Sequence, residues 1–464
     1  MKKKIASAKI IMLAVVITVP ILSLILWGNN TGVAAKTQDT YKSLEIFSNV
    51  LSIIQKNYVE NVETTEVLQG AIKGMLASLD PHSSYMKPDD FKELKLETKG
   101  SFTGIGIEIT TKDSILTVVS PIEGTPGFNK GLKAGDKIIK IEDEPTKDMS
   151  LMEAVKKLRG EKGTEVTISI HREGWTQLKR ITIVRDVIPL HSVKSRLLEP
   201  GYAYIRITNF QSKTTNDFIS ALEELAKIGP IKGLIMDLRN NPGGLLAQSV
   251  KLADVFIDEG VIVSTKGRVT EQNTVYEARK DDTPHNFPIA ILVNEGSASA
   301  SEIVAGALQD HNKALIVGVQ TFGKGSVQTI IPMSNGAGLR LTTARYYTPK
   351  GISIQAKGIT PDIYVENHPI ADTPEENGDN EPRFLREKDL KQHLTNGNAP
   401  KKEDKEIKDT LIEEDTPDDK ESDEEKALKI KKELERDQQL NTGLMLLKGL
   451  NVFNSFSNDK TAKK

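Results

Sequence analysis

Apolar runs and amphipathic stretches alternate along the largest part of the chain, from residue 189 to residue 365. Short apolar runs of β type lie at 203–207, 233–236, 289–293 and 314–319. The stretches between these runs repeat their apolar positions at helical spacing, as at 216–228, 246–257 and 301–308. Such alternation predicts an α/β core with crossover helices and a largely parallel sheet.

A smaller unit of different character precedes this core, from about Gly100 to Asp186. Short β-rich runs such as GIGIEIT and EVTISIHR are separated by Gly, Pro and Asp turns, and one helix is expected at 151–158. We therefore predict a small β-rich domain next to the α/β core.

Both ends of the chain also show helical spacing. Residues 41–54 place apolar side chains on one stripe, namely Leu44, Phe47, Val50 or Leu51, and Ile54. After residue 366 the chain becomes polar and acidic, and such a segment buries too little apolar surface to become ordered. Helical spacing returns near residue 425 and predicts a C-terminal helix that docks on the core or on another subunit.

Composition excludes several classes of protein. The chain has 464 residues, a formal charge of −2 and no cysteine. The near-balanced charge offers no basic surface for nucleic acid. Without cysteine there are no thiol nucleophiles, no cysteine zinc sites and no disulfides. We predict neither a metal nor a cofactor.

The N-terminus indicates export. Three lysines follow Met1, and residues 10–27 carry no charge, a length of about 18 residues at the short limit for a spanning helix. Val33, Ala34 and Ala35 are small enough for signal-peptidase cleavage. A cleaved signal peptide and a retained membrane anchor both remain open. In either case the rest of the chain crosses the membrane, to the periplasm or the outer face of the cytoplasmic membrane.

Ser299 is the first candidate for chemistry. It lies in GSASASEI at 296–303, between an apolar strand and an apolar helix. Ser299 and Glu302 match a capping box, in which the serine only satisfies helix amides. The same position would also expose a hydroxyl beside free N–H groups that stabilise an oxyanion. Both interpretations remain open from spacing alone.

A serine nucleophile needs a base, and Lys324 is the candidate. It lies between glycines in TFGKGSVQ at 321–328, after an apolar run. Burial there would lower the lysine pKa toward the neutral amine, although an exposed loop lysine is the ordinary alternative. The preceding glycines fit a P-loop only up to Gly325, where Ser or Thr is needed, so nucleotide binding is not expected.

Together these segments resemble the C-terminal processing peptidases, also called tail-specific proteases. The resemblance covers about residues 40–365. It rests on five motifs in order: LDPHSSYM at 79–86, the glycines Gly104 and Gly106, DLRNNPGG at 237–244, GSASASEI and TFGKGSVQ. The resemblance implies a Ser–Lys serine endopeptidase with a PDZ domain.

The resemblance also implies roles for single residues. Ser299 would be the nucleophile, Lys324 the general base, and Gln328 the residue that orients the lysine. On a strand, positions 324 and 328 would share one face. The backbone amides of Gly244 and Ala300 would form the oxyanion hole.

The same resemblance identifies the small β-rich unit as a PDZ domain, which adds a peptide strand to a sheet edge and holds its terminal carboxylate on loop amides. The peptide-binding loop would be Thr103, Gly104, Ile105, Gly106 and Ile107, with the two isoleucines lining an apolar pocket. Arg172 is a candidate for a gating residue.

The predicted fold class is an α/β (mixed α and β) catalytic core with an inserted β-rich PDZ domain and helical N- and C-terminal segments. The predicted parts are a signal peptide or anchor (1–35), a helical region (36–96), the PDZ-like domain (97–186), the catalytic domain (187–365), a polar linker (366–425) and a C-terminal helix (426–464).

The predicted function is cleavage of protein substrates that are recognised by their apolar C-terminal tails. A non-catalytic PDZ scaffold on a protease-like fold is the alternative from another class, and a carrier of apolar small molecules is a weaker one. Expected partners are the substrates, a second copy of the chain and the membrane through the N-terminus. An adaptor protein is left open, and no nucleic acid is expected.

Overall fold

The computed structural model describes residues 39–112, 115–122, 124–147, 149–280, 285, 287–366, 386–390, 392–394 and 423–461. The chain divides into two compact units, one up to Met75 and the other from Leu76 onward. The apolar segment 10–27 lies outside the described residues, and so does most of the polar stretch 366–425. The leader and linker predicted there stay predictions.

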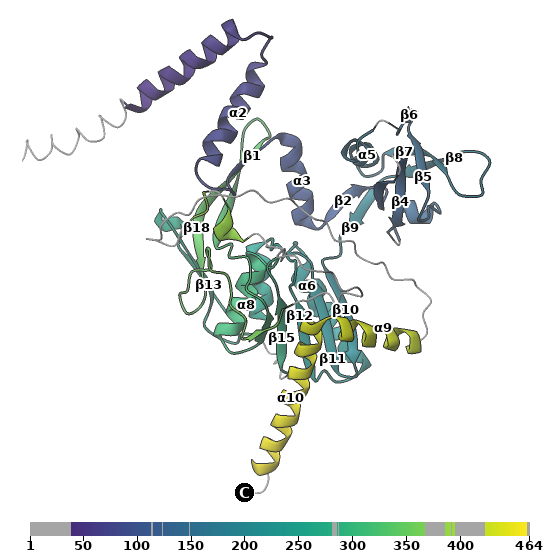
Figure 1. Ribbon diagram of the computed structural model, residues 1–464, viewed down its shortest axis with the longest axis vertical. Helices are drawn as coiled ribbons and strands as arrows, with labels where there is room; N and C mark the ends of the chain where they lie inside the picture. The colour runs from purple at the N-terminus through teal and green to yellow at the C-terminus, as the bar shows by residue number, and fades with distance from the viewer. Residues whose placement is uncertain are drawn as a thin grey trace, which may run out of the picture. The chain divides into compact units, whose positions relative to one another are not determined.

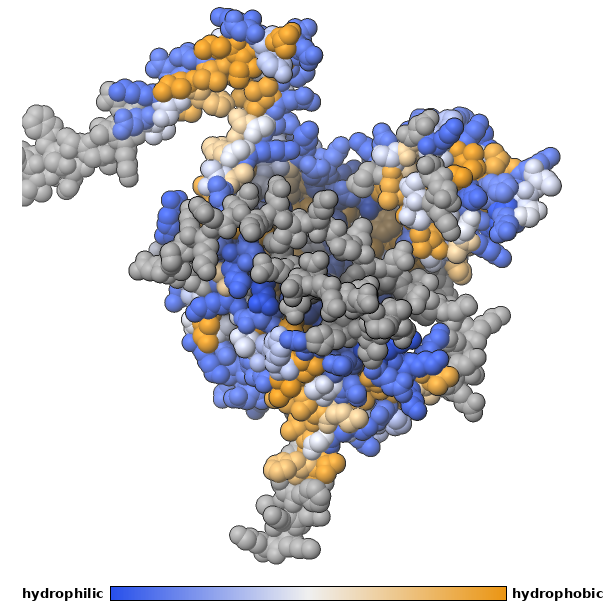
Figure 2. All heavy atoms as spheres, viewed as in Figure 1, coloured by the Kyte–Doolittle hydropathy of each residue, from blue (hydrophilic) through white to orange (hydrophobic). Residues whose placement is uncertain are grey.

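The N-terminal unit contains a helix at 39–57 and most of α2 (Thr64–Ala77). On the apolar stripe expected for the first helix, Leu44, Phe47 and Val50 are exposed, and Leu51 and Ile54 are half-buried. Figure 2 shows this stripe as an orange band along the helix at the upper left. Among the described residues, no helix combines the length and the apolar character that crossing a membrane would take.

A mainly parallel sheet forms the centre of the second unit. Its order is β10 (Val193–Glu199), β11 (Tyr202–Ile207), β12 (Gly233–Asp237), β15 (Ile289–Val293), β16 (Leu315–Gly318) and β19 (Ile363–Tyr364). The hairpin of β10 with β11 is antiparallel, and the remaining pairs are parallel. This is the predicted α/β core (Figure 1).

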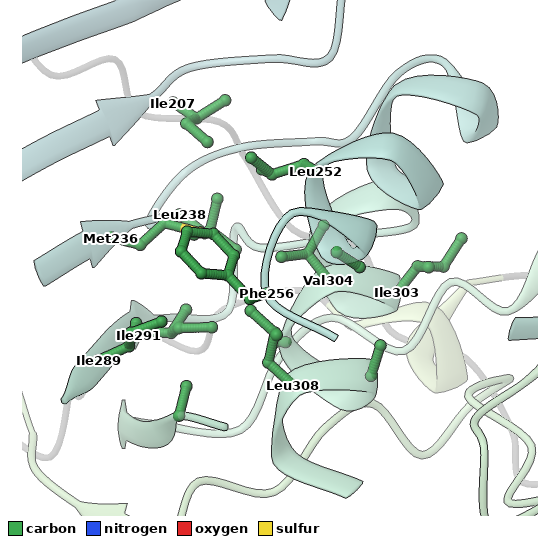
Figure 3. Packing of buried hydrophobic residues seen from close by; sticks show 14 of the residues in the cluster. Ile207, Met236, Leu238, Leu252, Phe256, Ile289, Ile291, Ile303, Val304 and Leu308 are labelled. Carbon is green, nitrogen blue, oxygen red and sulfur yellow. The ribbon is translucent and has the colours of Figure 1, made fainter. Parts of the chain in front are cut away.

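Side chains alternate along each strand, so the two faces of this sheet present different residues. Different helices cover these two faces. Ile289, Ile291 and Val293 face the core that includes α6 (Thr214–Ile228), α7 (Leu246–Asp254) and α8 (Ala300–Asp310). Figure 3 shows part of this packing. Ala290 and Leu292 point the other way, toward α10 (Gln438–Thr461), which follows α9 (Asp423–Arg436). The C-terminal helix therefore docks on the core of its own chain.

A second, antiparallel sheet was not predicted. It runs in the order β1 (Ser84–Met86), β18 (Gly338–Tyr347), β13 (Val261–Gly267) and β14 (Thr274–Glu277), and β17 (Ser326–Pro332) also pairs with β18. Helix α3 (Pro88–Lys99) follows β1 and packs Phe91 against Gly338. This sheet brings the LDPHSSYM segment to the part of the chain that carries Lys324.

The inserted β-rich domain is confirmed. Its sheet contains β3 (Ile107–Lys112), β4 (Ile115–Pro121), β5 (Lys137–Ile141), β6 (Glu144–Pro145), β7 (Glu165–His171) and β8 (Lys179–Val184). The helices are α4 (Pro126–Asn129) and α5 (Leu151–Leu158). Strands β2 (Ser101–Gly104) and β9 (Asp186–Pro189) pair with each other where the domain begins and ends, and so form a two-stranded stem.

Candidate active site

Three loops meet where β12, β15 and β16 end. Because these strands are parallel neighbours, their carboxyl ends lie at one edge of the sheet, the usual place for a site in such folds. The Ala298 amide donates to Asn241 O at 3.0 Å, and the Phe322 amide donates to Ser297 O at 3.1 Å. The loops that carry Ser299, Lys324 and Gly244 are thus hydrogen-bonded to one another.

Ser299 stands at the N-cap of α8 with a strained backbone. Its φ of 55° and ψ of −109° are rare for a residue with a side chain, and strain of this kind collects at functional sites. The side chain is half-buried, so the hydroxyl is not sealed in the core. Ala300 opens the helix, and its amide is one of the first four that lack an intrahelical acceptor.

The capping-box interpretation of Ser299 is met only in part. The Ser299 amide donates to the Glu302 carboxylate at 2.7 Å. Among the described residues, however, the Ser299 hydroxyl makes no capping hydrogen bond. The hydroxyl is therefore not occupied by the structural role that the spacing indicated.

Glu302 joins the serine loop to the lysine loop, a connection that sequence reasoning missed. Its buried carboxylate also accepts hydrogen bonds from the Thr321 hydroxyl at 2.6 Å, the Gly323 amide at 2.7 Å and the Lys324 amide at 2.9 Å. The Ser299 and Lys324 amides share one oxygen, Oε2. This shared acceptor holds the backbone nitrogens of Ser299 and Lys324 close together.

Burial dominates the electrostatics of both ionisable groups. It raises the pKa of Glu302 to about 7, although four hydrogen bonds favour the ionised form. Burial lowers the pKa of Lys324, and the charge of Arg340 lowers it further. Glu387, Glu302 and Asp80 act on this lysine in the opposite direction. The net shift favours the neutral amine that a general base requires.

Lys324 lines a cavity of about 430 Å³. The other lining residues come from the loops just described and from the LDPHSSYM segment: His82, Asn240, Pro242, Asn294, Glu295, Gly296, Ala298 and Phe322. The wall contains Ala298, directly before Ser299. A substrate in this cavity would contact the loop that carries the serine and would also contact Lys324.

Gly243 and Gly244 bring the NPGG turn against the serine. A Cβ at Gly243 would lie 2.9 Å from Ser299 Cβ and 2.9 Å from the Ala300 nitrogen. Gly244 has a φ of 140°, and a Cβ there would collide with the Phe210 carbonyl. Both positions thus require glycine, and the turn lies against Ala300, the first residue of α8. An oxyanion hole made of the Gly244 and Ala300 amides would need this proximity.

Arg239 lies in the same loop as Gly244 and binds two carboxylates. Its guanidinium binds the buried Asp237 at 2.7 Å and Asp437, between α9 and α10, at 2.8 Å. Burial alone would raise the pKa of Asp237, but Arg239 outweighs it and holds that pKa below its usual range. The C-terminal helix therefore connects directly to the loop that carries Gly244, for which the sequence held no recognisable signal.

The strand argument for Gln328 was wrong. Lys324 precedes β17, and the register of β17 shifts between Val327 and Gln328, so the two side chains do not follow simple alternation. Gln328 donates to the Ser326 hydroxyl at 2.9 Å. No hydrogen bond joins it to Lys324 within the described part of the chain, and its orienting role stays a prediction.

The predicted peptide-binding loop begins the inserted domain, with Thr103 and Gly104 on β2 and Gly106 at a φ of 74°. Ile105 is only 2% exposed and belongs to the domain core. The prediction that Ile105 lines an open pocket is therefore not met. Ile107 is half-buried and remains the candidate.

Arg172 is held inside the same domain by the buried Asp136 at 2.6 Å and by the Gly131 carbonyl at 2.8 Å. Its guanidinium also stacks on Trp175. The gating role expected of Arg172 stays a prediction. Within the described ranges, no cluster of three or more His, Asp or Glu side chains is placed to bind a metal.

Comparison with known families gives three matches in order along the chain. Residues 28–90 match the activating protease CtpB N-terminal domain, residues 103–183 a PDZ domain, and residues 201–365 peptidase family S41.

Individual relatives agree with these matches. A carboxy-terminal-processing protease of Bartonella bacilliformis is 47% identical over 332 residues, which cover 71% of this chain and 76% of that protein. The carboxy-terminal processing protease CtpA of Bacillus subtilis is 35% identical over 366 residues, 78% of each protein. The solved photosystem II D1 C-terminal processing protease is 31% identical and covers 69% of this chain and 92% of its own, with a TM-score of 0.41. The Bartonella and Bacillus relatives show that the chain belongs to the carboxy-terminal processing proteases, serine peptidases of family S41.

Proposed function

We propose that Ser299 and Lys324 form the catalytic pair of an endopeptidase that selects proteins by their C-terminal tails. The observation that carries the proposal is the shared oxygen of Glu302, which holds the backbone of both residues together. The lowered pKa of Lys324 supports the role of base.

In this mechanism neutral Lys324 takes the proton of the Ser299 hydroxyl while the oxygen attacks a peptide carbonyl. The Gly244 and Ala300 amides stabilise the oxyanion. The lysine then gives its proton to the leaving amine, and an acyl-enzyme remains. Water, deprotonated by the same lysine, releases the acid and restores the serine.

The PDZ domain would supply selectivity, because such domains bind the terminal carboxylate of an extended peptide. The basic, apolar N-terminus supports export and membrane association, and the exposed stripe at 41–54 supports self-association. Extracytoplasmic proteins with apolar C-termini are the proposed substrates.

The test compares Ser299→Ala and Lys324→Ala with Ser334→Ala and Lys313→Ala, two exposed positions away from the loops described above. The substrate is an unfolded protein with an apolar C-terminus, offered with and without its last residues. We expect the first two variants to lose cleavage, the controls to keep it, and removal of the tail to slow the wild type. Digestion at the wild-type rate by either site variant would refute the catalytic pair.

A further inference from the structure

A short turn beyond the region matched to family S41 lies against the lysine loop. The 3-10 helix η2 (Glu387–Asp389) follows the family match, which ends at residue 365. The Glu387 amide donates to the carbonyl of Phe322, two residues before Lys324, at 3.2 Å. The Glu387 side chain is completely buried. A buried acid in so polar a stretch requires specific partners.

Those partners surround Lys324. The two carboxylate oxygens of Glu387 lie 2.9 and 2.7 Å from Nε2 of His82. Oε1 also accepts a hydrogen bond of 2.7 Å from Gln355 Nε2, and the side-chain oxygen of Gln355 accepts one from the Gly325 amide at 3.0 Å. Glu387 therefore connects the histidine of the LDPHSSYM segment to both sides of Lys324.

The contact fixes the chemistry that His82 offers to the cavity. A carboxylate cannot donate a hydrogen bond, so Nε2 must carry the proton. Nδ1 then has no hydrogen-bond partner among the described residues, and His82 lines the same cavity as Lys324. A histidine oriented by a carboxylate behind it is a recurring arrangement in catalytic sites.

Glu387 also acts on Lys324 through charge. Among the described residues, the charged groups that act most strongly on this lysine are Arg340 on β18, Glu387 on η2, Glu302 on α8 and Asp80 before β1. Burial and Arg340 lower the lysine pKa, and Glu387 opposes them more strongly than the other two acids.

We propose that Glu387 is a positioning residue of the active site, which holds the His82 imidazole in one orientation on the cavity wall and supplies a negative charge beside Lys324. The inference rests on the proposed role of Lys324 as base. It makes a segment outside the family match part of the catalytic machinery.

The first experiment measures kcat/KM against pH for the full-length protein and for Glu387→Gln, Glu387→Asp and the exposed neighbour Lys388→Gln. The glutamine keeps the size and one acceptor oxygen but removes the charge, so the lysine pKa falls further. The rising limb should move to lower pH by roughly half a unit or more. The aspartate should restore it in part, and Lys388→Gln should match the wild type. An unmoved limb in Glu387→Gln would overturn the charge effect.

The second experiment does not depend on activity. In the Ser299→Ala background, nitrogen-15 NMR reports which ring nitrogen of His82 is protonated. We expect a proton on Nε2 with Glu387 present and loss of this preference in Glu387→Gln. An unprotonated Nε2 with Glu387 intact would overturn the inference. If Ser299→Ala or Lys324→Ala kept full activity, the catalytic pair would be wrong while this result on His82 would still stand.

Discussion

The ion pair between Arg239 and Asp437 makes a prediction about how the C-terminal helix is held. Asp437→Asn preserves the shape of the side chain but replaces one oxygen with an amide nitrogen. Both oxygens contact the guanidinium, at 2.9 and 2.8 Å, and Oδ1 also caps α10 by accepting the Leu440 amide at 2.9 Å. The asparagine can keep one of these oxygens but turns an N–H group toward Arg239 in place of the other.

The magnitude follows from burial. The Arg239 and Asp437 side chains are 10% and 20% exposed, so solvent screens the pair little. Loss of a hydrogen bond to a charged partner costs about 1.5–3 kcal/mol. A matched control joins the same helical segment to the core through Arg196 and Glu433, whose side chains are 39% and 38% exposed. For Glu433→Gln we expect about 0–1 kcal/mol.

Amide hydrogen exchange is the assay, because α10 can open without global unfolding. The buried positions Leu444 and Leu447 should exchange about 10- to 150-fold faster in Asp437→Asn than in the parent protein, which corresponds to about 1.5–3 kcal/mol. The Ser299→Ala background removes the proposed nucleophile and so guards against self-digestion. The reasoning fails if Asp437→Asn changes exchange no more than Glu433→Gln does.

Three further substitutions test the site and the inserted domain. Gly243→Ala should abolish peptide cleavage in an activity assay, because its φ of 103° and the close serine turn leave no room for a methyl group; retained activity would contradict that geometry. Arg172→Gln should destabilise the PDZ domain by about 3–5 kcal/mol, seen by Trp175 fluorescence in urea, because it leaves Asp136 buried without its charge partner; an unchanged midpoint would refute this. Since burial raises the pKa of Glu302 from its usual value of 4.5 to about 7, its contribution to stability falls as pH rises between these values. Glu302→Gln should remove that slope from the free energy of unfolding measured against pH, and an identical slope would contradict the burial argument.

The parallel core was predictable because its strands are continuous apolar runs such as Ile289–Val293, buried on both faces. The antiparallel sheet was not, because β1 has only three residues and is defined by its partner β18, far along the chain. Local spacing carries no information about such a pairing.

The candidate site also contains residues that the sequence marks and residues whose contacts only the folded chain reveals. Ser299 and Lys324 could be named as candidates because glycines and strand ends mark their loops, and their roles were implied by the family resemblance. Glu302 appeared from spacing as a helix cap, and only the folded chain shows that it also binds the lysine loop. Glu387 lies in a stretch whose composition indicates disorder, and its burial depends on donors from His82 and Gln355. The argument that Lys324 and Gln328 share one strand face failed because Lys324 precedes β17 and a register shift interrupts the alternation.

The stem of β2 and β9 has a consequence for the order of folding. Strand β1 must find β18 across the whole inserted domain, and the entropy lost in closing a loop grows with its free length. The stem places the Gly100 carbonyl 2.9 Å from the Leu190 amide, so a domain that has already folded removes its own residues from that loop. The folded insert then adds almost no free length to the loop between β1 and β18. A substitution that kept the insert unfolded would slow assembly of the catalytic sheets although no residue in them had changed.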